Sequence, residues 1–453
     1  MTNTDIGRTA LNLLQSKGAD KAQCVVTASR KDEFNVESGK LSLLRTTFDR
    51  KLSMTAFVNG KKGSITTTAM DTASISSFCD ECIISALSGV SDEAYDIAPA
   101  ADERIFFQQS SEFDVEALFF RIREFLDDVN HEFPLIKFDQ VICAYELKEE
   151  VYQNTNGTHY TVRSGCYSLD AMFSANDGKH STSFNYDAIL CNDLSKPFIE
   201  HGTIRNTLRN TVSMLYPRPL TGKFIGTLIM QPTCLESFLH MIVSSFTSDS
   251  VIIDGTSPWR YKLNEKVADK GFNLSVAPYH EGIICGERVT EYGFIAEDYD
   301  IIKDGILENF SLSYYGSNKT GLKRAGTTGS SYVVKKGNTP FSNIIAGIDR
   351  GIIVGRFSGD APAASGDFSG IAKSSFLIEN GQIVCPLTET MISGNLSDML
   401  CNIRAISNEE YLNGYTSIPC IAFDGIVISG KWRSRAKRTK LSPLMSLNMI
   451  DLT

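Results

Sequence analysis

Lys51-Leu-Ser-Met-Thr-Ala-Phe-Val58 is a β-type run that is followed directly by Asn59-Gly60. Asparagine and glycine tolerate the positive φ angles of a tight turn, so this pair predicts a β-hairpin. The same kind of signal returns at Asn156-Gly157 and at Asn176-Asp177-Gly178, each time between two β-type segments. Repeated hairpin turns predict antiparallel sheets in the first half of the chain.

Stretches with helical spacing alternate with these β-type runs. Apolar side chains that recur every three or four positions form one face of a helix. The predicted helices are residues 5–17, 72–88, 114–130, 193–215, 233–246 and 397–406. After residue 221, β-type runs and turns dominate. The predicted fold class is α+β: N-terminal α/β segments with antiparallel sheets and packed helices, followed by a β-rich C-terminal domain with a few helices.

Two stretches divide the chain into parts. Residues 99–114 are polar and irregular, and Tyr216-Pro-Arg-Pro219 places two prolines around one residue, which interrupts regular structure. The sequence therefore predicts three parts. They are an N-terminal α+β segment at 1–98, a middle α+β segment at 114–216 with a helix and an antiparallel meander, and a β-rich C-terminal domain at 221–453.

Composition limits the classes of function. The 453 residues carry a net charge of −9 at pH 7, which argues against nucleic acid and anionic membranes as general partners. Charged residues interrupt the first 20 positions, and no stretch approaches the roughly 18 apolar residues of a membrane span. The eleven cysteines are an odd number and suit reduced thiols, so we expect a cytoplasmic protein. Cys79 and Cys82 form a C-x-x-C inside a predicted helix, where a structural role is favoured over a redox or zinc site.

Several common catalytic motifs are absent from the sequence. It holds no G-x-x-x-x-G-K-[ST], no G-x-G-x-x-G, no G-x-S-x-G and no H-E-x-x-H. These motifs cradle phosphates, bind dinucleotides, present a nucleophilic serine or hold zinc. Kinase, Rossmann and α/β-hydrolase functions are therefore disfavoured.

One predicted helix brings two ionisable groups together. In Pro232-Thr-Cys-Leu-Glu-Ser-Phe-Leu-His240, the side chains of Glu236 and His240 are four residues apart and are neighbours on one helix face. A carboxylate and an imidazole so placed could hold a metal ion or share a proton. The alternative is a partly buried histidine that makes a hydrogen bond to a helical neighbour, and spacing alone favours this alternative.

Several further segments resemble the TldD/PmbA family over nearly the whole chain. The C-terminal segments are Ser365-Gly-Asp-Phe-Ser-Gly370, Phe376-Leu-Ile-Glu-Asn-Gly-Gln-Ile383, Ile392-Ser-Gly-Asn-Leu-Ser-Asp-Met-Leu400 and Asn402-Ile403. The N-terminal ones are Phe57-Val-Asn-Gly60, Gly63-Ser64 and Asp71. Members of the TldD type are cytosolic metallopeptidases that cleave unstructured peptides in a closed chamber. They bind zinc through an H-E-x-x-x-H helix and a later cysteine in a glycine-containing loop.

The resemblance implies an incomplete zinc site in this chain. Glu236 falls on the motif's glutamate and His240 on its second histidine, but Leu235 stands where the first histidine is expected. Cys420 begins an apolar run and does not lie in a glycine-containing loop. A catalytic zinc site normally keeps three protein ligands. This pattern resembles the PmbA (TldE) branch of the family.

The resemblance to that branch implies a partner subunit. The chain is expected to be the non-catalytic subunit of a heterodimeric protease whose TldD-type subunit carries the zinc, or a homodimer when alone. Unfolded peptide is the expected substrate, no cofactor is expected in this chain, and neither membrane nor nucleic acid is an expected partner. Glu236 and His240 remain as catalytic candidates only in the sense of a remnant of the family motif.

Two other functions stay open at the level of sequence. The chain could be an autonomous metallopeptidase that uses Glu236, His240 and a further ligand such as His280 or Cys420. It could also be a regulatory protein that binds a DNA-associated partner through the basic run Lys431-Trp-Arg-Ser-Arg-Ala-Lys-Arg-Thr-Lys440. A solvated extension is the favoured interpretation of that run because the rest of the chain is acidic.

Overall fold

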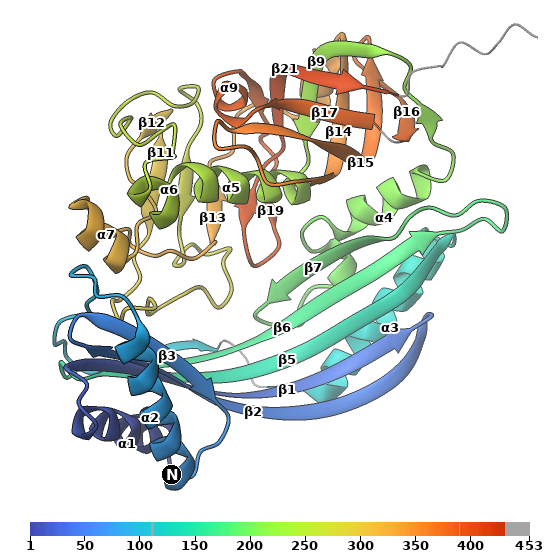
Figure 1. Cartoon of the computed structure of the whole chain (residues 1–453). Helices are drawn as coiled ribbons and strands as arrows, with labels where there is room; N and C mark the ends of the chain where they lie inside the picture. The colour runs from blue at the N-terminus through green and yellow to red at the C-terminus, as the bar shows by residue number, and fades with distance from the viewer. Residues whose placement is uncertain (110–112, 389, 431–453) are drawn as a thin grey trace, which may run out of the picture.

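A long curved sheet and a second, β-rich body lie across from one another in the molecule (Figure 1). The structure is a computed structural model that describes residues 1–109, 113–388 and 390–430. The basic run at 431–440 therefore lies outside the described residues. Among the helices of the described residues, none combines the length and the apolar character that a bilayer crossing needs.

The curved sheet has seven strands in the order β3-β2-β1-β5-β6-β4, with β7 also paired to β6. Their bounds are β1 Lys21–Glu37, β2 Lys40–Val58, β3 Lys61–Thr67, β4 Arg104–Gln109, β5 Ile136–Asn154, β6 His159–Ala175 and β7 Asn185–Cys191. All pairs are antiparallel except β4 with β6. The long β1–β5 ladder joins the first and the middle segment of the chain in one sheet.

Helices cover the two ends of this sheet. They are α1 Asn3–Ser16, α2 Thr72–Ser88, α3 Val115–Glu132 and α4 Ile204–Ser213, with a 3-10 turn η1 at Phe198–Glu200. α1 and α2 share one apolar core with β1 and β2, while α3 packs on β5 and β6 in another. The predicted hairpin at Asn59-Gly60 joins β2 to β3. Asp71 and Asp114 cap the N-termini of α2 and α3, where each carboxylate accepts a hydrogen bond from a main-chain N–H of the first turn.

The C-terminal region contains two further sheets. One has the order β12-β11-β10-β13-β20-β19, and the other β14-β9-β21-β17-β15-β16-β8, with β18 on β21. The strands are β8 Arg218–Pro219, β9 Lys223–Met230, β10 Leu274–Val276, β11 Tyr299–Lys303, β12 Ile306–Leu307, β13 Tyr332–Val334, β14 Arg350–Gly359, β15 Asp367–Glu379, β16 Gln382–Thr388, β17 Thr390–Asn395, β18 Ile403–Ile406, β19 Tyr411–Leu412, β20 Ser417–Ile418 and β21 Ile421–Ser429. The predicted α+β class with a β-rich C-terminal region is confirmed.

The helix α5, Pro232–Phe246, lies against both of these sheets. Its apolar stripe, with Phe238 and Phe246 fully buried, belongs to the core that the two sheets share. Phe238 meets Phe357 and Phe368 edge-on, with ring centroids 5.0 Å apart in each pair. The shorter helices of the region are α6 Asp249–Ile253, α7 Tyr314–Thr320, α8 Phe341–Ala346 and α9 Leu396–Leu400.

Two of the predicted helices are wrong in part. The stretch 193–215 holds only η1 and α4, and the stretch 397–406 ends as a helix at Leu400. Ile403–Ile406 instead forms β18, which pairs with β21 through partners such as Ile406 and Ile421. Pairing with a distant strand overrides local helix propensity here, because the ladder supplies hydrogen bonds that a short helix end lacks.

Candidate functional site

Glu236 and His240 lie on the side of α5 that faces the curved sheet and the β13–β20 edge of the C-terminal region. Pro232 occupies the first turn of α5, where a missing N–H costs nothing. Glu236 is half-buried and His240 is exposed. Both residues lie in the described part of the chain, and no hydrogen bond or ion pair joins them there. Helical spacing therefore predicted their common face, but they do not form a pair.

Glu236 is held by a turn from the C-terminal end of the chain. Burial raises the pKa of the Glu236 carboxyl, a hydrogen bond from the Asn413 side chain opposes the shift, and the charge of Asp187 on β7 adds to it. Asp187 is itself buried and accepts hydrogen bonds from Thr203 and Thr207. A carboxyl with a raised pKa can take up and release a proton nearer to neutral pH than an exposed one.

His240 is paired with Tyr332, the first residue of β13. The hydroxyl of Tyr332 lies 3.4 Å from Nδ1 of His240, and the two rings meet edge-on with centroids 4.9 Å apart. Desolvation by the surrounding protein lowers the pKa of His240, so its imidazole is neutral at pH 7. Burial raises the pKa of Tyr332 to about 12, and the nearby Glu236 charge contributes to that shift. Tyr332 thus connects the two residues electrostatically.

The turn at Asn413 and Gly414 joins three parts of the molecule. Besides holding Glu236, Asn413 accepts a backbone hydrogen bond from Leu190 of β7 at 2.8 Å, and the carbonyl of Gly414 accepts one from Ile284 at 2.7 Å. Gly414 has φ +85°, and a Cβ atom there would lie 2.4 Å from the carbonyl oxygen of Leu190. Only glycine fits, because both the φ angle and the close approach exclude a side chain.

The other predicted ligand residues lie elsewhere. Leu235 is only 1% exposed and packs in the apolar core, because residues five apart on a helix are rotated by about 140°. In the turn before Gly282, His280 accepts a backbone hydrogen bond from that glycine at Nδ1. Cys420 is buried in a separate apolar cluster with Ile229, and burial raises the pKa of its thiol to about 12.

These donors do not fit a zinc site. Across the described residues, no three His, Cys, Asp or Glu side chains come together in a way that could hold a metal ion. The Cys420 thiol is buried in an apolar core and His280 accepts a hydrogen bond within its own turn, so neither joins Glu236 and His240 in a tetrahedral set. The arrangement around α5 can instead donate and accept hydrogen bonds through a neutral imidazole, a phenol and a carboxyl of raised pKa.

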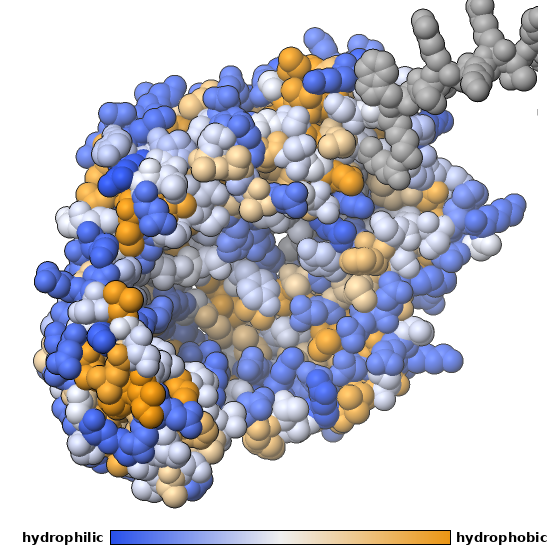
Figure 2. All heavy atoms as spheres, viewed as in Figure 1, coloured by the Kyte–Doolittle hydropathy of each residue, from blue (hydrophilic) through white to orange (hydrophobic). Residues whose placement is uncertain are grey.

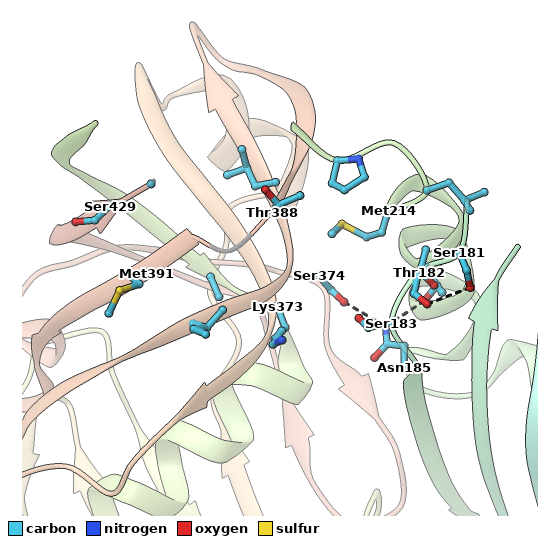
Figure 3. A pocket seen from close by; sticks show the side chains of 17 residues that line it. Ser181, Thr182, Ser183, Asn185, Met214, Lys373, Ser374, Thr388, Met391 and Ser429 are labelled. Carbon is cyan, nitrogen blue, oxygen red and sulfur yellow. Dashed lines mark hydrogen bonds between the residues drawn. The ribbon is translucent and has the colours of Figure 1, made fainter. Parts of the chain in front are cut away.

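Two cavities open between the curved sheet and the C-terminal region, and the space-filling view is hollowed there (Figure 2). One, of about 580 Å³, lies between the β7–α4 part of the sheet and strands β15–β17. Its lining is rich in hydroxyl and amide groups; Figure 3 shows Asn185 facing Ser374, with a 3.3 Å hydrogen bond between them. Lys373 lines the same cavity. The other, of about 630 Å³, lies between β5–β6 and the loop after β10.

Sequence reasoning missed Tyr332 and Asn413. Both come from segments far from α5 in the chain, and only the pairing of β13 with β20 brings them beside it. A signal for Asn413 existed, since Asn413-Gly414 is the same turn dipeptide that predicted the hairpins. For Tyr332, which begins an ordinary β-type run, no local signal was available.

Comparison with known proteins assigns the class of the C-terminal region. Residues 221–430 match the family model of the PmbA/TldA metallopeptidase C-terminal domain. The chain is 24% identical over 291 residues to the metalloprotease PmbA homolog of Haemophilus influenzae. This alignment covers 62% of each of the two chains. It is 27% identical over 209 residues to metalloprotease PmbA of Escherichia coli O157:H7, covering 44% of this chain and 45% of that protein. The matches thus span less than two thirds of the length of these curated relatives.

Solved structures share the fold of the whole described chain. The TldE structure from Thermococcus kodakarensis superposes with a TM-score of 0.80 at 17% identity, covering 94% of this chain and 100% of that chain. A Bacteroides thetaiotaomicron protein, named as a proposed modulator of DNA gyrase, gives 0.81 at 23% identity, covering 95% and 99%. The family model, the names of the curated relatives and the shared fold all point to the TldD/PmbA family.

Proposed function

We propose that this chain is the PmbA (TldE)-type subunit of a cytosolic TldD/TldE-like metallopeptidase that acts on unstructured peptides, and that it does not itself carry the zinc. The observation that carries the proposal is the orientation of α5. Leu235 packs in the core at the place of the expected first histidine, while in the described part of the chain Glu236 and His240 lack a third metal-ligating donor beside them. Curated relatives of the chain are named metalloproteases, which supports a role in proteolysis.

The cavity at β7 and β15–β17 suits the substrate side of this role. Its hydroxyl and amide groups can hydrogen-bond the main chain of an extended peptide, which is the sequence-tolerant part of peptide recognition. Zinc would come from a TldD-type partner. One relative, from Saccharolobus solfataricus, is named a zinc metalloprotease TldD homolog and is 24% identical to this chain. The match covers 62% of this chain and 66% of that protein. In such an assembly this chain would complete the wall of the chamber.

The proposal is tested by reconstitution. The purified chain, a TldD-type chain with an intact H-E-x-x-x-H motif, and their equimolar mixture are each incubated with an unfolded substrate such as reduced, alkylated casein. We expect no cleavage by this chain alone, strong cleavage by the mixture, and co-elution of the two chains in size-exclusion chromatography. Cleavage by this chain alone would overturn the proposal.

An autonomous metallopeptidase is the second candidate, because the PmbA relatives are themselves named metalloproteases. In that case His240 would be a ligand, and His240→Ala should abolish both metal uptake and cleavage by the isolated chain. Ser237→Ala, on the exposed part of the same helix, is the matched control. If His240→Ala leaves both properties unchanged, this candidate is eliminated.

A further inference from the structure

One cysteine differs electrostatically from all the others. Every cysteine of the chain lies in the described residues, and the pKa of the thiol is raised at each except Cys285. At Cys285 a hydrogen bond from the Cys166 thiol lowers the pKa, and the Ser164 hydroxyl and the Arg288 charge act in the same direction. Because the thiolate is the reacting form of cysteine, the lowered pKa favours the reactive form at Cys285.

The two thiols come from opposite sides of the seam between the curved sheet and the C-terminal region. Cys166 lies on β6, and Cys285 lies in the loop that follows β10. That loop is fixed to the sheet, because Nε2 of Gln108 on β4 donates a 2.8 Å hydrogen bond to the carbonyl of Gly286. Gln108 pairs with Ser164 in the β4–β6 ladder, so the loop is anchored directly beside Cys166.

The loop is also fixed from within. The guanidinium of Arg288 donates hydrogen bonds to the carbonyls of Pro278 at 2.7 Å and Gly286 at 3.2 Å, and it stacks 4.1 Å from the ring centroid of Tyr279. Cys285 has a φ of +53°, which a non-glycine residue adopts only when its surroundings hold it there. The backbone at Cys285 is thus held in one conformation beside β6.

Reagents can reach the pair. Cys166, Cys285, Ser164 and Arg288 all line the cavity of about 630 Å³ between β5–β6 and the loop. Both cysteines are half-buried, whereas the cysteines of the cores, such as Cys143 and Cys234, are fully buried. A small polar oxidant can enter this cavity but not those cores.

We propose that Cys285 and Cys166 form a reversible peroxide-reactive thiol–disulfide site that, once oxidised, ties β6 covalently to the C-terminal region. This inference goes beyond the proposed function and holds whether or not the chain has a partner subunit. It also separates these two cysteines from the C-x-x-C pair Cys79 and Cys82, whose thiols contact main-chain oxygens and Met54 inside the α2 core.

The chemistry balances with hydrogen peroxide as the oxidant. The Cys285 thiolate attacks one oxygen of the peroxide, the O–O bond breaks, and the departing hydroxide takes up the thiol proton to form water, leaving a sulfenic acid. The Cys166 sulfur then attacks the sulfenic sulfur, the S–O bond breaks, and a second water leaves with the Cys166 proton. In sum, two thiols and one peroxide give one disulfide and two waters. Two molecules of a small thiol such as glutathione reverse the reaction and leave as their own disulfide.

Alkylation rates test the activation of Cys285. The full-length native protein is treated with limiting iodoacetamide at pH 7, and the modified cysteines are identified by peptide mass spectrometry. We expect Cys285 to be alkylated several-fold faster than Cys401, which is the exposed cysteine and has a raised pKa. Faster alkylation of Cys401 would show that exposure alone governs reactivity and would overturn the proposal.

Peroxide treatment tests the disulfide itself. We expect a linked peptide that contains Cys166 and Cys285, two hydrogens lighter than the separate peptides, which disappears on reduction with glutathione. Cys166→Ser should instead give a sulfenic acid at Cys285 that dimedone traps, and Cys401→Ser should leave the link unchanged. Absence of the link in wild-type protein, with the native circular dichroism spectrum retained, would overturn the proposal; so would dimedone labelling at Cys401 in place of Cys285.

Discussion

At the scale of single residues, the candidate site depends on a carboxyl that the fold keeps partly from water. Glu236 has a raised pKa because of its burial, with Asn413 supplying a hydrogen bond that partly offsets the effect. At pH values between the ordinary pKa of glutamate and the raised pKa of Glu236, the Glu236 carboxyl binds more protons in the native state than in the unfolded state. The stability of the fold therefore falls as pH rises through that window.

Glu236→Gln removes this effect and keeps an acceptor for Asn413. We expect the thermal midpoint of the variant to exceed that of the wild-type protein at pH 8, and the difference to shrink at pH 4. Glu281→Gln, at an exposed glutamate, serves as the control and should show little difference at either pH. A difference that is as large at pH 4 as at pH 8 would contradict the burial of the Glu236 charge.

Leu235 offers a second test at the same scale. Because its side chain is enclosed by the apolar core, Leu235→His places an imidazole there without partners and should cost about 2–5 kcal/mol of unfolding free energy. The variant should also gain no tight zinc binding in a calorimetric titration. Ser237→His, at an exposed position of α5, is the matched control and should change stability little. Tight zinc binding by Leu235→His without loss of stability would show that position 235 faces His240.

At the scale of elements, the turn between β19 and β20 positions the site. It brings Asn413 to α5 and hydrogen-bonds both β7 and the loop after β10 through its main chain. The backbone of Gly414 lies so close to Leu190 that no side chain fits between them. This four-residue turn therefore sets the distance between the curved sheet and the C-terminal region at this point.

Gly414→Ala should destabilise the protein more than Gly157→Ala. Both glycines have a positive φ, at +85° and +99°, which costs a non-glycine residue about 1–3 kcal/mol. At Gly157 nothing lies within 4 Å of the added Cβ, whereas at Gly414 the Leu190 carbonyl must also move. Urea-unfolding midpoints measure the two losses. Equal losses would show that the contact with β7 is not a constraint.

The limits of prediction from sequence follow from the same elements. The apolar stripe of α5 and the hairpin at Asn59-Gly60 are local patterns, so helical spacing and turn chemistry were enough to predict them. Tyr332 and Asn413 reach α5 only through pairing between strands that are far apart in the chain, and no local pattern encodes that contact. The strand at Ile403–Ile406 was missed for the same reason.

At the scale of the whole molecule, cavities lie along the seam between the curved sheet and the C-terminal region, and their linings mix apolar side chains with hydrogen-bonding groups (Figure 2). Hydrogen bonds cross the seam at both ends, for example from Tyr152 to the carbonyl of Tyr292 and from Asn185 to Ser374. Such an arrangement gives a fixed wall with hydrogen-bonding groups on its inner side. In the proposed function, this inner side would hold the main chain of an extended peptide.

The zinc content of the isolated chain tests this account most directly. The purified, reduced protein is incubated with one equivalent of zinc, dialysed against a metal-free buffer and measured by inductively coupled plasma mass spectrometry, with a TldD-type chain treated in parallel. We expect well below one zinc per chain for this protein and about one for the TldD-type chain. One tightly bound zinc per chain in this protein, lost in His240→Ala, would contradict the account.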